Sequence, residues 1–173
     1  MDQLLLKNLL LLAILLTVGI VFSFVAIKLI IQIFKRGLDI GEALKNPAIV
    51  ILFSASILCM GILFSSLHDP LYEIYRILEQ TDDVVWQSIK YTLIFLGVAF
   101  VVWLLVIGSA ISIVSLSTKS IKETDEINAG NWKIGLFLAA IIITLTLLTA
   151  SPLSSVMESI IPYPELPDLF YII

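Results

Sequence analysis

Four long stretches of almost uninterrupted apolar residues constrain the fold of this chain more than any other feature of its sequence. They run from about Leu9 to Phe34, Pro47 to Ser66, Tyr91 to Ser117 and Trp132 to Ser151. Each exceeds about 18 residues, the length from which an apolar stretch is interpreted as a membrane span. Peptide groups in hydrocarbon have no water to bond to, so each span must be a helix that satisfies its own backbone. We therefore expect an all-α membrane protein with four transmembrane helices.

The composition excludes several other classes of protein. Hydrophobic residues make up 60% of the chain and charged residues 14%, against roughly 45–50% and about 25% in soluble domains. The net charge of −4 leaves no basic surface for nucleic acid. The single cysteine, Cys59, lies inside an apolar stretch, so we expect it to pack there and to form neither a disulfide nor a metal site.

The charges in the connections predict how the chain is oriented. Basic residues gather in loops 35–45 and 118–131, namely Lys35, Arg36, Lys45, Lys119 and Lys122. Short loops rich in Lys and Arg stay in the cytoplasm, so both loops should face inward and both termini outward. The outward connection, residues 68–90, should hold a short amphipathic helix on the membrane surface, because Leu71, Ile74 and Leu78 recur at helical spacing.

The C-terminal tail, residues 153–173, differs from the rest of the chain. Pro162, Pro164 and Pro167 prevent a helix over residues 160–173, so we expect this part to be extended. Its other residues are largely apolar. They predict docking on this protein, on a neighbouring copy or on the outer lipid surface.

The two halves of the chain are similar in layout. Asn46 and Asn131 each precede an apolar stretch and are 85 residues apart, as are Ser66 and Ser151 at the far ends. Asparagine is a favoured N-cap because its side-chain oxygen accepts from unpaired amides of the first helical turn. We interpret residues 1–67 and 91–152 as two helical hairpins of the same orientation, related by an axis along the membrane normal.

One of the helix-joining turns also suggests a family. The segment from Glu126 to Gly135, Glu-Ile-Asn-Ala-Gly-Asn-Trp-Lys-Ile-Gly, and the later Thr149-Ala150-Ser151 resemble the repeat of the YjfL-like family, domain of unknown function 350. In that family a Glu-Ile-x-x-Gly-Asn turn opens the second helix of each hairpin. The first repeat of this chain departs from it, with Lys45 where glycine is expected. The resemblance implies a four-span protein of the bacterial inner membrane and brings no catalytic residues.

The spans lack the groups that catalysis requires. None of them contains Asp, Glu, His or Arg, and the only histidine, His68, lies where the second span ends. Metal-binding and phosphate-binding motifs are missing as well. We expect no enzymatic activity, no cofactor and no metal site.

Two features of the spans are candidates for function. Apart from Lys133 at the mouth of the fourth span, Lys28 is the one intramembrane charge, about 10 Å from the end of its span at 1.5 Å per residue. We expect it to extend to the headgroups, the alternatives being anion attraction or pairing within an assembly. Gly108, Ser109, Ser112 and Ser115 form a stripe of small residues on the third span. Such stripes allow close helix packing, within the four-helix unit or between copies, and hydroxyls can also line a pore.

These observations favour a non-enzymatic membrane protein that acts as a self-associating scaffold or as a partner subunit. Its partners would be the lipid bilayer, further copies of itself and a cytoplasmic protein held by the two inward turns. The alternative is a channel or passive transporter subunit, in which copies surround a pore lined by the hydroxyls of the third span.

Overall fold

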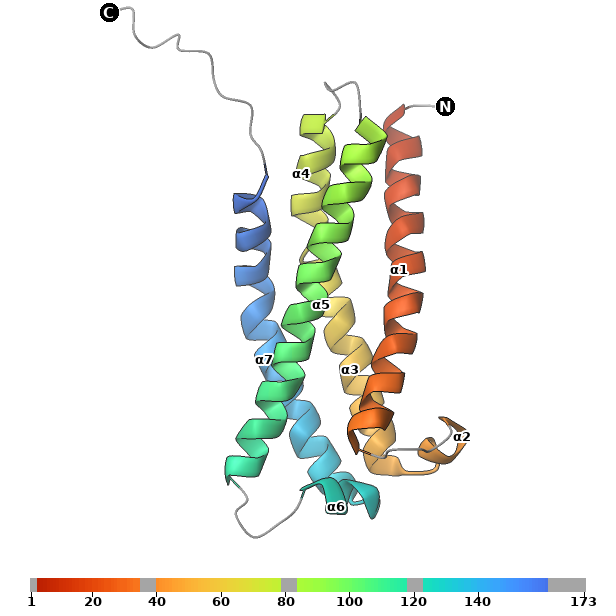
Figure 1. Ribbon diagram of the computed structural model, residues 1–173, viewed down its shortest axis with the longest axis vertical. Coiled ribbons are helices and arrows are strands. Elements are labelled where there is room, and N and C mark those ends of the chain that lie inside the picture. Colours follow the sequence, from red (N-terminus) through yellow and green to blue (C-terminus); the bar gives the residue numbers. More distant parts are fainter. Residues whose placement is uncertain (1–2, 35–39, 79–83, 118–122, 162–173) are drawn as a thin grey trace, which may run out of the picture.

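The described residues fold almost entirely into helices. The computed structural model describes residues 3–34, 40–78, 84–117 and 123–161, and no strand occurs among them. The helices are α1 (Gln3–Phe34), α2 (Ile40–Ala43), α3 (Pro47–Ser65), α4 (His68–Leu78), α5 (Val84–Ser117), α6 (Glu123–Asn128) and α7 (Trp132–Ser159) (Figure 1). Four apolar stretches, which include all of α3 and α7 and most of α1 and α5, are long and apolar enough to cross a membrane. The predicted all-α membrane fold is confirmed.

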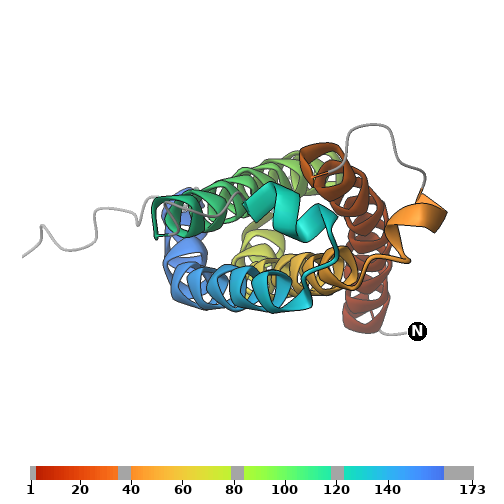
Figure 2. The ribbon, with the colours of Figure 1, turned by 90° about the horizontal axis from the view of Figure 1, so that it is seen from below.

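The long helices form two hairpins that point the same way. Helices α1 and α5 run in one direction, and α3 and α7 run back in the other (Figure 1). The short helices α2 and α6 lie where α3 and α7 begin, and we call this the turn end of the molecule. Seen from that end, α3 and α7 lie in one row and α5 crosses on the other side of the bundle (Figure 2). Helix α6 covers the end of the bundle between them.

The closest helix pair joins the two hairpins. Helices α3 and α7 run parallel, and Ala48 is fully buried between them. A Cβ atom added to Gly135 would lie 2.9 Å from the Cα atom of Ala48, so the backbones approach as closely as glycine permits. Lipid is as apolar as leucine, and helices in a bilayer therefore associate through such close packing of small residues.

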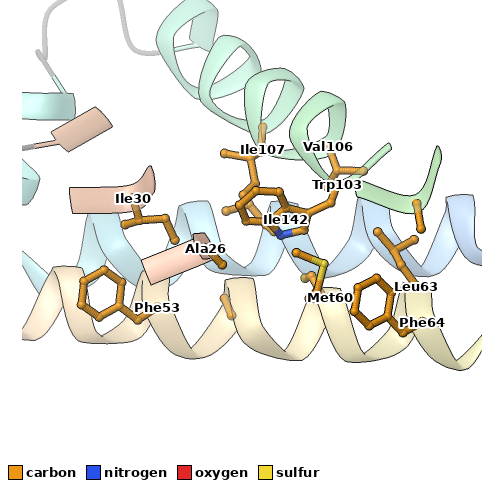
Figure 3. Close-up of a cluster of buried hydrophobic side chains, with 14 of the residues drawn as sticks. Ala26, Ile30, Phe53, Met60, Leu63, Phe64, Trp103, Val106, Ile107 and Ile142 are labelled. Carbon is orange, nitrogen blue, oxygen red and sulfur yellow. The ribbon is translucent and has the colours of Figure 1, made fainter. Parts of the chain in front are cut away.

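The core of the bundle lies between α3, α5 and α7, with the second half of α1 closing one side. Trp103 of α5 reaches into this core beside Met60 of α3 and Ile142 of α7 (Figure 3). The buried residues of α1 are Ala26, Ile30, Ile31 and Phe34. Between Leu16 and Val25, by contrast, α1 has no buried residue. This stretch of α1, residues 16–25, is thus the most loosely packed part of the spans for which burial is described.

The two hairpins do not pack in equivalent ways. An axis along the membrane normal would require α1 to pack against α7 as α5 packs against α3. Helix α5 contacts α3 as well as α7, but α1 makes no comparable contact with α7 among the described residues. The hairpins therefore share a direction, while the predicted axis does not describe their packing.

The structure extends three helices, α1, α5 and α7, beyond the predicted spans at the end opposite the turns, and α1 begins at Gln3 rather than near Leu9. Helix α5 begins at Val84 rather than near Tyr91, and α7 continues past Ser151 and Pro152 to Ser159. Helix α4 follows α3 after two residues and packs against α5 and α7. Leu153 and Met157 of α7 are buried, which explains why the helix continues although Pro152 removes one of its hydrogen bonds.

The predicted amphipathic helix of the middle connection is α4. Its apolar face, Pro70, Leu71, Ile74 and Leu78, is buried against the protein instead of being left for lipid. The Tyr75 hydroxyl donates to Thr92 Oγ1 at 2.6 Å, which fixes α4 to α5. Its location at the membrane surface stays a prediction. The predictions for the extended tail concern residues 162–173, outside the described part.

Candidate functional site

The two helix-joining turns place an asparagine side chain at the start of α3 and of α7. Asn46 Oδ1 accepts from the backbone amide of Ile49 at 3.1 Å, and Asn131 Oδ1 accepts from that of Lys133 at 3.2 Å. Both residues have extended backbone angles, as an N-cap requires. Pro47 at the first position of α3 loses no hydrogen bond there.

Asn46 also joins the two hairpins. Its Nδ2 atom donates to the carbonyl oxygens of Ile127 at 2.8 Å and Asn128 at 3.2 Å, at the end of α6. Asn46 is only 8% exposed, so water does not replace these bonds. The Nδ2 atom of Asn131 instead donates to Glu126 Oε2 within its own turn, at 2.7 Å. The sequence does not predict this link, because the cap motif says nothing about where the nitrogen of the side-chain amide bonds.

The second turn explains why glycine is present in one repeat and lysine in the other. Gly130 has a φ of +86°, which favours glycine. The backbone amide of Asn131 donates to the backbone carbonyl of Glu126 at 3.0 Å, and the backbone amide of Gly130 donates to the carbonyl of Ile127 at 3.1 Å. This pair of bonds is a Schellman motif. The first turn closes with a shorter bond pattern, from the Asn46 amide to the Ala43 carbonyl at 3.1 Å. No described non-glycine residue has positive φ, and Lys45 is therefore tolerated.

The predicted stripe of small residues lies on the outside of α5. Gly108, Ser109, Ser112 and Ser115 are all exposed. The first three line a shallow hollow of about 470 Å³ on this surface, which we call the α5 hollow; its other lining residues are Leu104, Leu105, Ile113 and Leu116. The Ser112 hydroxyl donates to the Gly108 carbonyl at 2.8 Å, so it is satisfied within its own helix.

This position corrects the interpretation that the stripe packs inside the four-helix unit. A Cβ atom added to Gly108 would meet nothing within 4 Å, because no part of the described monomer covers it. Leu105 and Leu116 beside the hollow are 63% and 77% exposed. Of the alternatives offered by the sequence, contact between copies and a pore formed between copies agree with this exposure.

Comparison with known proteins assigns the chain to a family. A family model described as Domain of Unknown Function (DUF350) matches residues 3–153. The chain belongs to this family. No curated protein and no solved structure matches it. The suspected resemblance to domain of unknown function 350 is confirmed, and the matched region of this DUF350 protein contains the capped turns and the α5 hollow.

The other small residues of the DUF350 bundle divide between its inside and its outside. Thr146 is fully buried, and its hydroxyl donates to the Ile142 carbonyl at 2.9 Å. It also shares a side-chain hydrogen bond with Cys59, which is buried on α3. Gly61 and Ser65 of α3 are exposed instead. The α3–α7 contact thus contains a small polar pair in an otherwise apolar interface.

The charged and titratable candidates do not converge on a site. Lys28 is exposed on α1, with its Nζ atom 4.7 Å from the centre of the Phe24 ring. None of the described carboxylates lies within ion-pair distance of it. His68 and Asp69 are exposed neighbours at the start of α4, and His68 Nδ1 lies 3.2 Å from Asp69 Oδ1. In residues 3–34, 40–78, 84–117 and 123–161, no group of acidic, histidine or cysteine side chains has the arrangement of a metal site.

Proposed function

We propose that this DUF350 protein is a non-enzymatic component of the bacterial inner membrane that associates with a second copy of itself through the α5 hollow. The exposure of Gly108, Ser109 and Ser112 carries the proposal. In lipid, small residues four positions apart let helices approach closely, and this contact drives association where no hydrophobic effect exists. A face that offers both a hollow and projecting leucines can pack against its own copy.

The geometry of the α5 face favours a second copy over lipid as its occupant. Leu105 and Leu116 project on either side of the small residues, so each face has a ridge and a depression. Two such faces related by a twofold axis place the ridge of one against the depression of the other. Flexible acyl chains fill the same depression without gaining fixed contacts.

The turn end supports a scaffolding role for the assembled protein. Asn46 fixes the end of α6 to the start of α3, so the two turns form one rigid surface. The basic residues of the loops around them favour the cytoplasmic side for this surface, with both termini outside. A dimer presents two copies of it to a cytoplasmic protein.

The oligomeric state tests the proposal. The purified protein is measured in mild detergent by light scattering, as the wild type and as Gly108→Leu. We expect wild-type dimers and at least about tenfold weaker association in the variant, because the added side chain fills the hollow. Gly61→Leu is the matched control, since Gly61 is exposed on α3 with nothing within 4 Å. A wild type that is monomeric at every concentration contradicts the proposal.

The alternative function is a channel subunit, which the exposed hydroxyls of Ser109, Ser112 and Ser115 favour. Copies arranged with these residues inward would surround a polar path. Liposomes that contain the protein should then pass ions or small solutes, and Ser112→Trp should block them. Vesicles that stay impermeable exclude this function and leave the scaffold unaffected.

A further inference from the structure

Two polar atoms are buried in the core of the bundle without a hydrogen-bond partner among the described residues. They are Trp103 Nε1 on α5 and Ser56 Oγ on α3. Trp103 is 1% exposed and Ser56 is 0% exposed. Buried polar groups in proteins are almost always satisfied, and in hydrocarbon an unsatisfied one is especially costly. Each atom therefore requires a partner that the described residues do not provide.

The packing of α3 against α5 brings the two residues to neighbouring turns of the facing helices. The ring centre of Phe22 on α1 lies 5.3 Å from that of Phe64 on α3 and 5.1 Å from that of Phe100 on α5. Phe64 and Phe100 therefore lie at one level of the antiparallel helices α3 and α5. Following the helices toward the turn end brings Met60 level with Trp103. Ser56 then follows Met60 by one turn, on the same face of α3. Figure 3 shows the indole of Trp103 beside Met60, with its nitrogen turned toward α3.

Ser56 differs from the other hydroxyl residues of the same spans. Ser54 donates to the Val50 carbonyl at 3.0 Å, and Thr146 donates to the Ile142 carbonyl. This bond to the preceding turn is the ordinary way in which a hydroxyl is satisfied in a membrane helix. Ser56 makes no such bond to a described residue, and its hydroxyl can therefore bond to a molecule held between α3 and α5.

The two atoms are chemically complementary through a water molecule. An indole N–H can only donate, while a serine hydroxyl can donate or accept. Water accepts from the indole and bonds to the hydroxyl at the same time, and buried waters characteristically occupy sites that offer two or more such partners. We propose that Trp103 and Ser56 hold a buried water molecule between α3 and α5, where it joins the two hairpins inside the membrane.

The contact between the indole and water can be observed directly in the full chain. The protein is labelled with ¹⁵N-tryptophan, and the chain contains only Trp86, Trp103 and Trp132. In detergent micelles, magnetisation transfer should give a cross-peak between the indole proton of Trp103 and water. Trp103→Phe assigns the signal. The absence of this cross-peak in the wild type overturns the proposal, as does evidence of a direct bond from the indole to Ser56.

A second test of the proposed water removes the serine hydroxyl. Ser56→Ala should abolish the Trp103 cross-peak with water, because the water loses one of its two partners. Ser54→Ala is the matched control, since Ser54 is exposed on the same helix and bonds to its own backbone. A cross-peak that persists unchanged in Ser56→Ala shows that Ser56 does not hold the water, and overturns the proposal. Neither result depends on the oligomeric state, so this test is independent of the proposed dimer.

Discussion

The side chain of Asn46 stabilises the molecule in two ways, because its oxygen caps α3 and its nitrogen binds the end of α6. Asn131 also caps its helix, α7, but its nitrogen binds Glu126 within the same turn and does not join the two hairpins. Losing a cap costs about 1 kcal/mol, and leaving a buried carbonyl without its donor costs about 1–3 kcal/mol. The two asparagines of the repeat are therefore equivalent in sequence and unequal in energy.

This inequality is measurable by substitution of each asparagine. Asn46→Ala should lower the free energy of unfolding by about 2–4 kcal/mol, and Asn131→Ala by about 1 kcal/mol. Asn46→Asp, which keeps the cap and removes the donor, should fall between them. Unfolding in mixed micelles, followed by circular dichroism, gives these values. Equal losses for the two alanine variants would show that the link to α6 contributes nothing.

A second residue-scale prediction concerns Gly135. Gly135→Ala places a Cβ atom 2.9 Å from the Ala48 Cα atom, where only backbone movement can make room. We expect a loss of about 1–3 kcal/mol in the free energy of unfolding, as overpacking of a close interface produces. Gly97→Ala on α5 is the control, because nothing lies within 4 Å of it. A stable Gly135→Ala protein would mean that α3 and α7 separate easily.

What the sequence predicts at this scale is local. The caps at Asn46 and Asn131 follow from a short motif, and so does the turn at Gly130. The bond from Asn46 to Ile127 spans 81 residues, and the water proposed between Ser56 and Trp103 would join different helices. No local pattern encodes such contacts, since they depend on how the helices pack.

At the scale of elements, helix positions follow from hydropathy but helix faces do not. Helix α5 is apolar on every side, so nothing in its pattern marks which face meets protein and which meets lipid. The stripe at Gly108 and Ser112 was therefore identifiable, while its exposure was not. Helix α4 has one clearly apolar face, and the sequence located that face without showing that α5 and α7 cover it.

The attachment of α4 can be tested through its bond to α5. Tyr75→Phe removes the hydroxyl that donates to Thr92 at 2.6 Å and leaves the ring in place. We expect a loss of about 1 kcal/mol in the free energy of unfolding. Tyr72→Phe is the control, because Tyr72 is 46% exposed on the same helix. If both variants match the wild type, the hydroxyl bond contributes nothing to holding α4 against the bundle.

At the scale of the whole molecule, the unequal packing of α1 and α5 leaves an open side. Helix α5 packs against α3 and α7 on one face and exposes the α5 hollow on the other. The contact that covers it can be isologous, with α5 against α5, or heterologous, with α5 against a different surface of the next copy. Only the first closes into a dimer, while the second continues into a chain of copies.

Cross-linking distinguishes these two arrangements. In an isologous contact the two Ser112 residues lie near the twofold axis, so Ser112→Cys should form a disulfide with its own counterpart when membranes are oxidised. The native Cys59 is fully buried and should not react. Gly61→Cys, exposed on α3, reports collisions that do not depend on α5. A cross-linked dimer in Ser112→Cys alone establishes the closed contact. Large oligomers in mild detergent without this disulfide would instead require the hollow to bind another surface of the next copy.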